Sequence, residues 1–411
     1  MQSASAGNRQ VAAAVKQALG RGRVLHLDFE TRSELDVTDV GAYRYAECPS
    51  TSIQCASYCF DDGPVHLWVP LPFLPEAVLG PLRARLRPQE TGTKIWVQVR
   101  PPEDLQAHLA AGGQVRAFNA NFERCMTNGG PGQKLGLPQI TIEQTYCVAA
   151  KAANMGMPRD LDGVAKALDT HRKDEAGRAD MLMLARPRRT KGKPWWTPED
   201  APEKFVNLYC YNVDDTKAER GVDHALPDMS ESEVEVYALD QRANDRGIQV
   251  DLEAVGNIRY LVEEYKRELS ARCRQITADP NNWLDIGISP TQREKIADWV
   301  REHGYPQLHN MQAETVKEYL RDPACPPLCR ELLQIYSAYN GKAVTKVYKF
   351  EEMVCRDGRV RGMFLYYGAG TGRWSSRGVQ LQNIFRPVIS PEQLDEAIEL
   401  FKKRNLGLIK F

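Results

Sequence analysis

Two closely spaced acidic residues are the first candidates for chemistry in this sequence. The stretch RVLHLDFETRS is an apolar run that leads into Asp28, Phe29 and Glu30. On a β-strand, residues two apart point to the same face, so the carboxylates of Asp28 and Glu30 are expected to project together. Adjacent carboxylates repel each other, and a divalent cation is the expected partner between them. Asp-x-Glu alone is weak evidence, because exposed strands often carry it.

A second acidic motif lies in the stretch VRAFNANFERCM. A short apolar strand over 115–118 leads into Asn119, and Phe122 and Glu123 follow. A junction between a strand and a helix can aim a carboxylate into a cleft. The alternative is that Glu123 simply complements the positive end of a helix dipole.

A third motif lies in the stretch TPEDAPEKFVNLYCYNVDDTKAERGVDHAL, which has helical spacing. Thr197 and Pro198 indicate a helix start or a turn. Tyr211 and Asp215 are four residues apart and therefore share one helix face. Asp214 competes for the role of Asp215, which we prefer because of that shared face. An ordinary amphipathic helix is the alternative.

The order of these motifs resembles the DEDD 3′–5′ exonuclease superfamily, in its Tyr-containing subclass. The resemblance implies an α/β ribonuclease-H-like fold, a mixed central sheet flanked by helices. It also implies that four acidic residues hold two divalent metal ions while Tyr211 orients a water molecule. The four are Asp28, Glu30, Glu123 and Asp215. The family usually has Asp where this chain has Glu123, but Glu carries the same charge and ligand oxygens.

The same resemblance implies the cofactor and the chemistry. Phosphodiester cleavage requires a hydroxide at neutral pH and a stabilised leaving oxygen, and two metal ions about 3.5–4 Å apart provide both. Mg²⁺ is expected, with Mn²⁺ as the alternative, because hard cations prefer carboxylate oxygens. Phe29 and Thr31 are expected near the terminal nucleotide. Asn119 is a further substrate-side candidate, although it is a better candidate for fixing the turn.

The elements that follow are mostly helical. Residues 231–244 have helical spacing, Asp251 is expected to cap a helix, and Ser289 is expected to start another, with Gln292 completing a capping box. Asp357-Gly358 indicates a hairpin turn. The tail after residue 388 is expected to form one amphipathic helix.

Near the end, the stretch TGRWSSRGVQLQNI resembles the primer–template-binding segment of bacteriophage-type family A DNA polymerases. Other stretches that carry this resemblance are GAYRYAECPSTSIQCASY, ALDQRANDRGIQVD and ISPTQ, so that it covers residues 24–387. It implies a thumb and the beginning of a palm after the exonuclease domain. The residues expected to contact DNA are Lys342, Lys346, Thr371, Arg373, Ser375, Ser376, Gln382 and Asn383.

The motifs that such polymerases use for synthesis, DxSxxE and HDE, do not occur after Asn383. Three interpretations follow. In the first, which we prefer, the polymerase is split and a second polypeptide supplies palm and fingers; a truncated sequence would look the same. In the second, the chain is a stand-alone exonuclease with a DNA-binding thumb. In the third, it is a non-catalytic DNA-binding or assembly subunit. The intact acidic set argues against the last.

Composition sets further limits. Lys plus Arg equals Asp plus Glu, at 54 each, so total charge does not argue for nucleic acid. Basic residues are concentrated over 342–377 and 186–196, where aromatic residues accompany them. Such runs are usually solvated surface.

The ten cysteines form no CxxC pair and are expected to be buried free thiols.

These observations predict three segments. Residues 1–20 are a tail, without the layout of a secretion signal. Residues 21–227 are the exonuclease domain, and residues 228–411 are the thumb and the start of the palm. No apolar run reaches membrane-spanning length. We expect a protein that acts on DNA in the cytoplasm of a phage-infected bacterium.

Overall fold

The computed structural model describes residues 22–170, 175–188, 192, 194–383 and 389–409. It divides into two compact units. Unit 1 comprises Met1–Gln249 and Met353–Gln382, and unit 2 comprises Val250–Glu352 and Asn383–Phe411. The predicted tail over 1–20 lies outside the described residues. Because the three predicted segments were defined by function, their boundaries stay a prediction.

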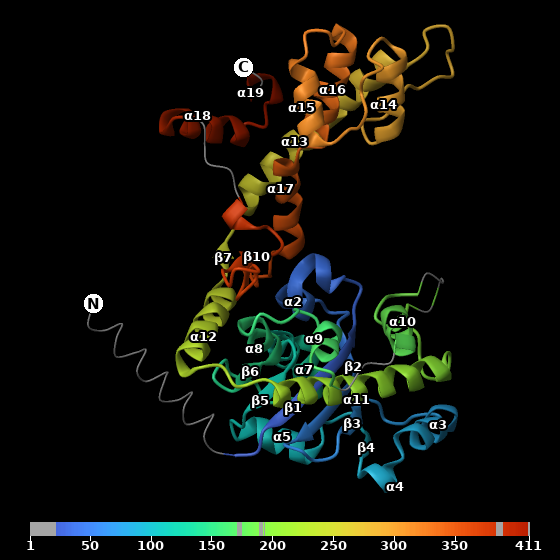
Figure 1. The fold of residues 1–411 in the computed structure, drawn as a ribbon, viewed down its shortest axis with the longest axis vertical. Coiled ribbons are helices and arrows are strands. Elements are labelled where there is room, and N and C mark those ends of the chain that lie inside the picture. The colour runs from blue at the N-terminus through green and yellow to red at the C-terminus, as the bar shows by residue number, and fades with distance from the viewer. Residues whose placement is uncertain (1–21, 171–174, 189–191, 193, 384–388, 410–411) are drawn as a thin grey trace, which may run out of the picture. The chain divides into compact units, whose positions relative to one another are not determined.

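Unit 1 is built on a mixed six-stranded sheet in the order β4-β3-β2-β1-β5-β6 (Figure 1). Strand β1 is antiparallel to β2 and parallel to β5, and β2 is antiparallel to β3. The pairs β3–β4 and β5–β6 are parallel. The strands are β1 (Leu25–Arg32), β2 (Ser52–Phe60), β3 (His66–Val69), β4 (Ile95–Val97), β5 (Val115–Ala117) and β6 (Thr145–Cys147).

Helices cover both faces of this sheet. Alternate residues of β1, among them Leu25, Leu27 and Phe29, pack into an apolar core with residues of α2, α5 and α6. The other face of β1 and β2 meets α11. The predicted α/β architecture, a mixed sheet flanked by helices, is therefore confirmed. The helices before α12 are α2 (Val37–Glu47), α3 (Glu76–Leu86), α4 (Pro88–Thr91), α5 (Glu103–Ala110), α6 (Ala120–Asn128), α7 (Gly130–Leu135), α8 (Val148–Asn154), α9 (Leu161–Ala167), α10 (Glu175–Leu184) and α11 (Pro202–Ala225).

Helix α12 (Glu231–Arg246) joins the sheet region to the later part of unit 1. Its Asp245 carboxylate accepts two hydrogen bonds from the Arg124 guanidinium, at 2.6 and 2.7 Å. The Tyr43 hydroxyl donates to the same carboxylate at 2.5 Å. Burial raises the pKa of Tyr43 far above its usual value, and Asp245 raises it further, against the opposing charge of Arg124. This cluster, which we call the Asp245 clamp, ties α2 and α6 to α12.

Helix α12 also binds the later segment that contains Phe364 and Trp374. The Asn244 side chain accepts from the main-chain N–H of Phe364 at 2.8 Å and donates to its carbonyl at 3.1 Å. The Trp374 indole donates to Asp240 at 2.7 Å. Two small sheets complete this region, one of β7 (Ile248–Gln249) with β8 (Arg359–Val360), the other of β9 (Phe364–Leu365) with β10 (Ser375–Ser376). The 3₁₀ helix η1 (Leu381–Asn383) follows.

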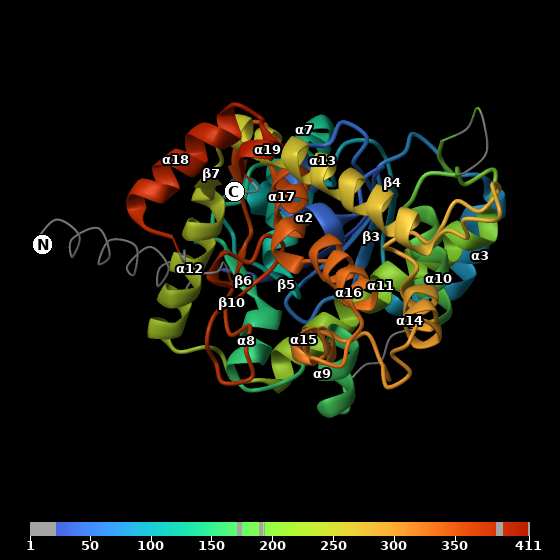
Figure 2. The same ribbon diagram turned by 90° about the horizontal axis from the view of Figure 1, so that it is seen from above.

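Unit 2 is helical. Helices α14, α15 and α16 pack with the end of α13 around a core that includes Ile296, Val300, Tyr305 and Leu332. Figure 2 shows α13 as one long helix, with α16 against it. The elements are α13 (Leu252–Thr277), α14 (Arg293–Glu302), α15 (Ala313–Arg321), α16 (Pro327–Tyr339), α17 (Lys342–Met353), α18 (Pro391–Lys402) and α19 (Leu406–Ile409).

Several predicted local features can be compared with the structure. Asp251 caps α13, and the turn at Asp357-Gly358 is present, with Gly358 at φ +77°. The helix start predicted at Ser289 is wrong. Helix α14 begins at Arg293, with Gln292 in the N-cap position, because residues 289–292 form a turn closed by the Gln292 N–H and the Ser289 carbonyl. The contact that Gln292 was predicted to make is present, since its side chain accepts from the Ser289 N–H at 2.9 Å. The predicted tail helix is α18, which has a full capping box from Ser390 and Gln393.

All ten cysteines are buried and free, as predicted. Within the described ranges, no helix combines the length and the apolar character that a membrane crossing requires.

The Asp245 clamp generates a stability prediction. Replacing Asp245 by Ala leaves the Arg124 guanidinium, whose side chain is 7% exposed, without its carboxylate. The free energy of unfolding is expected to fall by about 3 kcal/mol, the low end for breaking a buried pair, because Asp245 is partly exposed. Urea unfolding of Asp245→Ala measures this change.

The control is Glu90→Ala, which removes an exposed pair with Arg87. This control is expected to change stability by less than about 0.5 kcal/mol. Equal effects of the two substitutions would contradict a stabilising clamp.

Candidate metal and nuclease site

The central residues of the site alternate along β1. Asp28 and Glu30 point to the face that meets α11, while Phe29 points to the opposite face. Phe29 is only 4% exposed and lies in the apolar core. Thr31 is also buried, and its hydroxyl is 3.0 Å from that of Tyr45. Because neither side chain is open to a nucleotide in this structure, we do not carry these two residues into the proposed site.

Helix α11 supplies the third carboxylate. Ligand atoms of Asp28, Glu30 and Asp215 all lie within 4.8 Å of one another. Glu30 and Asp215 are buried and Asp28 is partly buried. Three carboxylates at this separation repel one another strongly in a poorly solvated site, which makes a bound cation the natural partner.

Asp214, the competing residue, is placed differently. Its carboxylate accepts from the Lys217 ammonium at 2.9 Å, one turn further along α11. Tyr211 lies four residues before Asp215 and is buried. Its ring packs closely against Gly177 of α10. A side chain at that position would not fit, since its Cβ would lie 2.8 Å from Cδ2 of Tyr211.

Glu123 lies in the first turn of α6, directly after β5, and is 4% exposed. It is outside the cluster of three carboxylates, but its charge interacts with two of them, Asp28 and Glu30. Burial raises the pKa of Glu123 well above its usual value, and the charges of Asp28, Glu219 and Glu30 raise it further. Its Oε2 atom is buried without a hydrogen-bond partner among the residues that the structure describes. A buried, repelled carboxylate of this kind is suited to a cation.

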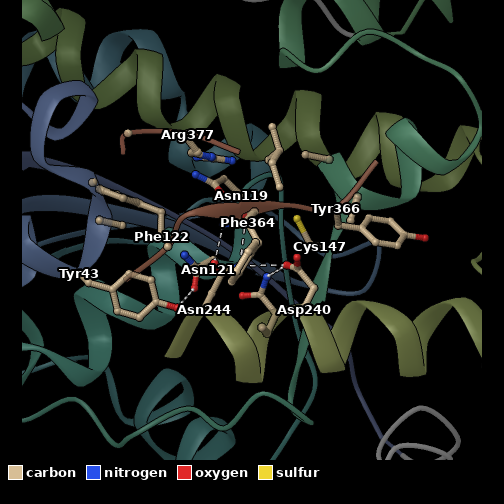
Figure 3. Close-up of a pocket in the computed structure, with 18 of the residues that line it drawn as sticks. Tyr43, Asn119, Asn121, Phe122, Cys147, Asp240, Asn244, Phe364, Tyr366 and Arg377 are labelled. Atoms are coloured by element: carbon tan, nitrogen blue, oxygen red, sulfur yellow. Dashed lines mark hydrogen bonds between the residues drawn. The ribbon is translucent and has the colours of Figure 1, made fainter. Parts of the chain in front are cut away.

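A cavity of about 400 Å³ lies within unit 1 and is lined in part by the start of α6 (Figure 3). Asn119 and Phe122, which flank Glu123 in sequence, line it together with Tyr43. The other walls include residues of α2, α8 and α12, Arg159, and residues 362–378, among them Phe364 and Arg377. Aromatic rings, amides and a guanidinium are groups that can contact bases and phosphates.

The predicted DNA-binding residues fall in both units. Thr371, Arg373 and Gln382 are exposed and belong to unit 1, as do the partly buried Ser375 and Ser376. Lys342, Lys346 and Asn383 belong to unit 2.

Much of the basic run is used internally. Arg361 pairs with Asp357, Lys349 pairs with Glu352, and Arg356 donates to the Glu47 carbonyl at 2.7 Å. Arg373 and Arg377 are exposed and form no ion pair with a described residue. These two cations are therefore the ones in this run best placed for phosphates.

Asn212 is a site residue that the sequence prediction missed. Its side-chain Nδ2 donates to Asp28 Oδ2 at 2.6 Å. Asn212 lies three residues before Asp215, and the same helical spacing that selected Tyr211 could have selected it. No sequence pattern pointed to Arg159, which also lines the cavity. Only folding brings this residue close to residues 366 and 367.

A second cluster of possible ligands comprises His26, Asp223 and His224. However, the Asp223 carboxylate already accepts from Lys151 at 2.8 Å and from Arg116 at 2.7 Å. His26 contacts Glu219 at 2.8 Å. Because two cations neutralise Asp223, we interpret this cluster as a structural charge network.

Comparison with known proteins gives one clear relative. No protein-family model matches the chain. The chain is 31% identical over 389 residues to a DNA polymerase from Bacillus phage SP02. The match covers 92% of this chain but 54% of that polymerase, so the chain spans about half the length of its relative. The chain is therefore homologous to part of a phage DNA polymerase.

Similarity to solved structures is weaker. The POL domain of Pol1 from M. smegmatis, solved with DNA primer-template and dNTP, aligns with 96% of this chain and 56% of its own at a TM-score of 0.46 and 15% identity. Trypanosoma brucei RNase D aligns with 57% of this chain and 70% of its own at a TM-score of 0.32 and 14% identity. Similarity at this level identifies no function.

The raised pKa of Glu123 generates a pH-dependent prediction. An unfolded Glu ionises near pH 4.3, so a folded state that disfavours ionisation loses stability as pH rises above that value. In metal-free buffer at pH 8, the free energy of unfolding of Glu123→Gln is therefore expected to exceed that of the parent by about 1–3 kcal/mol. The gain should shrink as pH falls towards about 4.

Urea unfolding in EDTA at several pH values measures this difference. Glu90→Gln, at an exposed position, is the matched control and should show no gain. A pH-independent difference between Glu123→Gln and the parent would mean that the carboxylate is not repelled in the folded protein.

Proposed function

We propose that this chain is the 3′–5′ exonuclease and primer–template-binding part of a family A phage DNA polymerase, with an exonuclease of the Tyr-containing DEDD class. The observation that carries the proposal is that Asp28, Glu30 and Asp215, from motifs far apart in sequence, have ligand atoms within 4.8 Å of one another. Homology to a phage DNA polymerase supports the polymerase context.

The donor set fits a hard divalent cation. Its ligands are carboxylate oxygens, without thiol or imidazole, which favours Mg²⁺ or Mn²⁺ over zinc. The buried Oε2 of Glu123, without a partner in the described part of the chain, fits a group that reaches a cation directly or through water. When bound, two such cations would supply hydroxide at neutral pH and stabilise the leaving 3′-oxygen.

The chain's own residues have separate roles in this proposal. Asp28, Glu30 and Asp215 hold one cation, and Asp28 with Glu123 holds the second. Tyr211 orients the attacking water. The cavity lined by Asn119 and Phe122 receives the single-stranded 3′ end, with Phe122 as a surface on which a base can stack. The reaction would release nucleoside monophosphates and serve proofreading in an infected bacterial cell.

We propose that the segment around Arg373 binds the primer–template DNA. Further contacts are proposed for Lys342, Lys346, Thr371, Ser375, Ser376, Gln382 and Asn383. Synthesis itself would use palm and fingers residues outside this sequence. We propose that they come from a second polypeptide, with the rest of a longer chain as the alternative source.

The first experiment incubates the purified chain with a 5′-labelled primer–template and Mg²⁺, with and without dNTPs. Stepwise shortening that EDTA abolishes and dNTPs do not reverse is the expected result. Absence of shortening would favour the non-catalytic DNA-binding subunit. Primer extension by the chain alone would refute the assignment of synthesis to residues outside it.

Adjacent aspartates provide a sharp test of the site. Asp215→Ala and Asp28→Ala are expected to reduce primer shortening to background while DNA binding is retained, because each removes a carboxylate from the cluster. Asp214→Ala is the matched control, since Asp214 pairs with Lys217 instead. Initial rates on a 5′-labelled single strand measure the effect, and normal degradation by Asp215→Ala would refute the metal assignment.

Arg373 tests the DNA-gripping segment. Loss of one phosphate contact in Arg373→Ala is expected to weaken primer–template binding and to reduce the slope of log K against log salt by about 1. Fluorescence anisotropy at several salt concentrations measures both quantities. Lys317→Ala, which removes a cation already paired with Glu314, is the control. An unchanged slope for Arg373→Ala would exclude this phosphate contact.

A further inference from the structure

Asn212 contacts the candidate site directly, although it is outside the acidic set. The residue is fully buried on α11. Its side-chain Nδ2 donates to Asp28 Oδ2 at 2.6 Å and lies 3.3 Å from the main-chain oxygen of Asp28. One amide therefore contacts both the carboxylate and the backbone of the same aspartate. Such a double contact restrains rotation of the Asp28 carboxylate.

Asn212 is itself held in place by the neighbouring strand. Ser57 lies opposite Asp28 in the β1–β2 register, so both side chains point to the face that meets α11. The Ser57 hydroxyl donates to the main-chain carbonyl of Asn212 at 2.6 Å and lies 2.6 Å from the Thr216 hydroxyl. All these groups except Asp28 are almost fully buried. Two strands and one helix are thus joined at the position of Asp28.

The Asn212 side chain is expected to lower stability unless the hydrogen bond from its Nδ2 has a function. The Asn212 Oδ1 atom is buried and has no hydrogen-bond partner within the described ranges. An unpartnered buried polar atom destabilises a protein, whereas an apolar side chain of similar volume would avoid that penalty. The neighbouring buried positions Leu208 and Val213 of α11 are apolar. The benefit of Asn212 must therefore come from the hydrogen bond to Asp28.

The chemistry explains why the donor is neutral. Repulsion among Asp28, Glu30 and Asp215 would turn the Asp28 carboxylate away from its neighbours. A lysine or arginine would restrain it too, but its positive charge would compete with a divalent cation. An amide donor orients a ligand carboxylate without neutralising it, as partners of metal ligands commonly do.

We propose that Asn212 is a positioning residue that holds the Asp28 carboxylate in the orientation in which Asp28, Glu30 and Asp215 bind one divalent cation. The inference rests on the proposed function. It adds a residue outside the acidic set and assigns the effect of that residue to metal affinity.

The test is direct Mn²⁺ binding to the purified chain, measured by calorimetry and by the paramagnetic resonance signal of free Mn²⁺. Asn212→Leu keeps the volume and removes the donor, and Asn212→Ala removes both. Each is expected to weaken Mn²⁺ binding about 10–100-fold. Primer shortening should show a matching rise in the Mn²⁺ concentration for half-maximal rate, with an unchanged KM for DNA.

Asn128→Ala is the matched control. This amide holds the backbone of Ile140 through two hydrogen bonds of 2.8 Å, so its loss costs stability in the same unit without contacting the cluster. Circular dichroism and thermal unfolding verify that each variant is folded. Asn128→Ala is expected to bind Mn²⁺ as the parent does.

The outcomes separate the two hypotheses. If the parent chain binds no Mn²⁺, the proposed function fails. If the parent binds Mn²⁺, Asp28→Ala does not, and folded Asn212→Leu binds as tightly as the parent, the metal site stands and the role of Asn212 is overturned. Equal weakening by Asn212→Leu and Asn128→Ala would reduce Asn212 to a general structural role.

Discussion

The packing of α11 against β1 is the constraint on which unit 1 depends. A helix normally meets a sheet through apolar side chains, but here His26, Asp28 and Glu30 of β1 face polar residues of α11. The contact brings like charges together in a poorly solvated place. The apolar core on the opposite face of β1 offsets this penalty, as do the apolar clusters beside α11. Stability from burial elsewhere thus holds the carboxylates in an unfavourable arrangement that a cation would relieve.

Sequence periodicity was sufficient for the local part of the site. The period of two on a strand correctly placed Asp28 and Glu30 on one side, and the spacing of Tyr211 and Asp215 correctly indicated a helix. The mixed sheet with flanking helices was predicted from the resemblance to the DEDD exonuclease superfamily and not from periodicity. Periodicity could not show which face of β1 carries the core, and therefore could not show that Phe29 is buried in it.

Contacts between distant segments were beyond such reasoning. Asn212 has a suitable spacing, but only the register of Ser57 with Asp28 shows which group its amide reaches. The Asp245 clamp and the division into two units depend on pairs far apart in sequence. The misplaced start of α14 has a local cause, since a serine followed by a proline can form a compact turn as readily as a helix cap.

The order of segments in unit 1 has a consequence for synthesis on the ribosome. Asn244 is bound to the backbone of Phe364, a residue 120 positions later, while residues 250–352 belong to the other unit. At about 5–20 residues per second, the ribosome needs on the order of ten seconds to reach Phe364 after Asn244. During that interval the Asn244 side chain lacks its main-chain partners at Phe364, and Asp240 lacks the Trp374 indole. The sheet and α11 are complete well before α12 acquires its second set of contacts, so unit 1 reaches its final form late in translation.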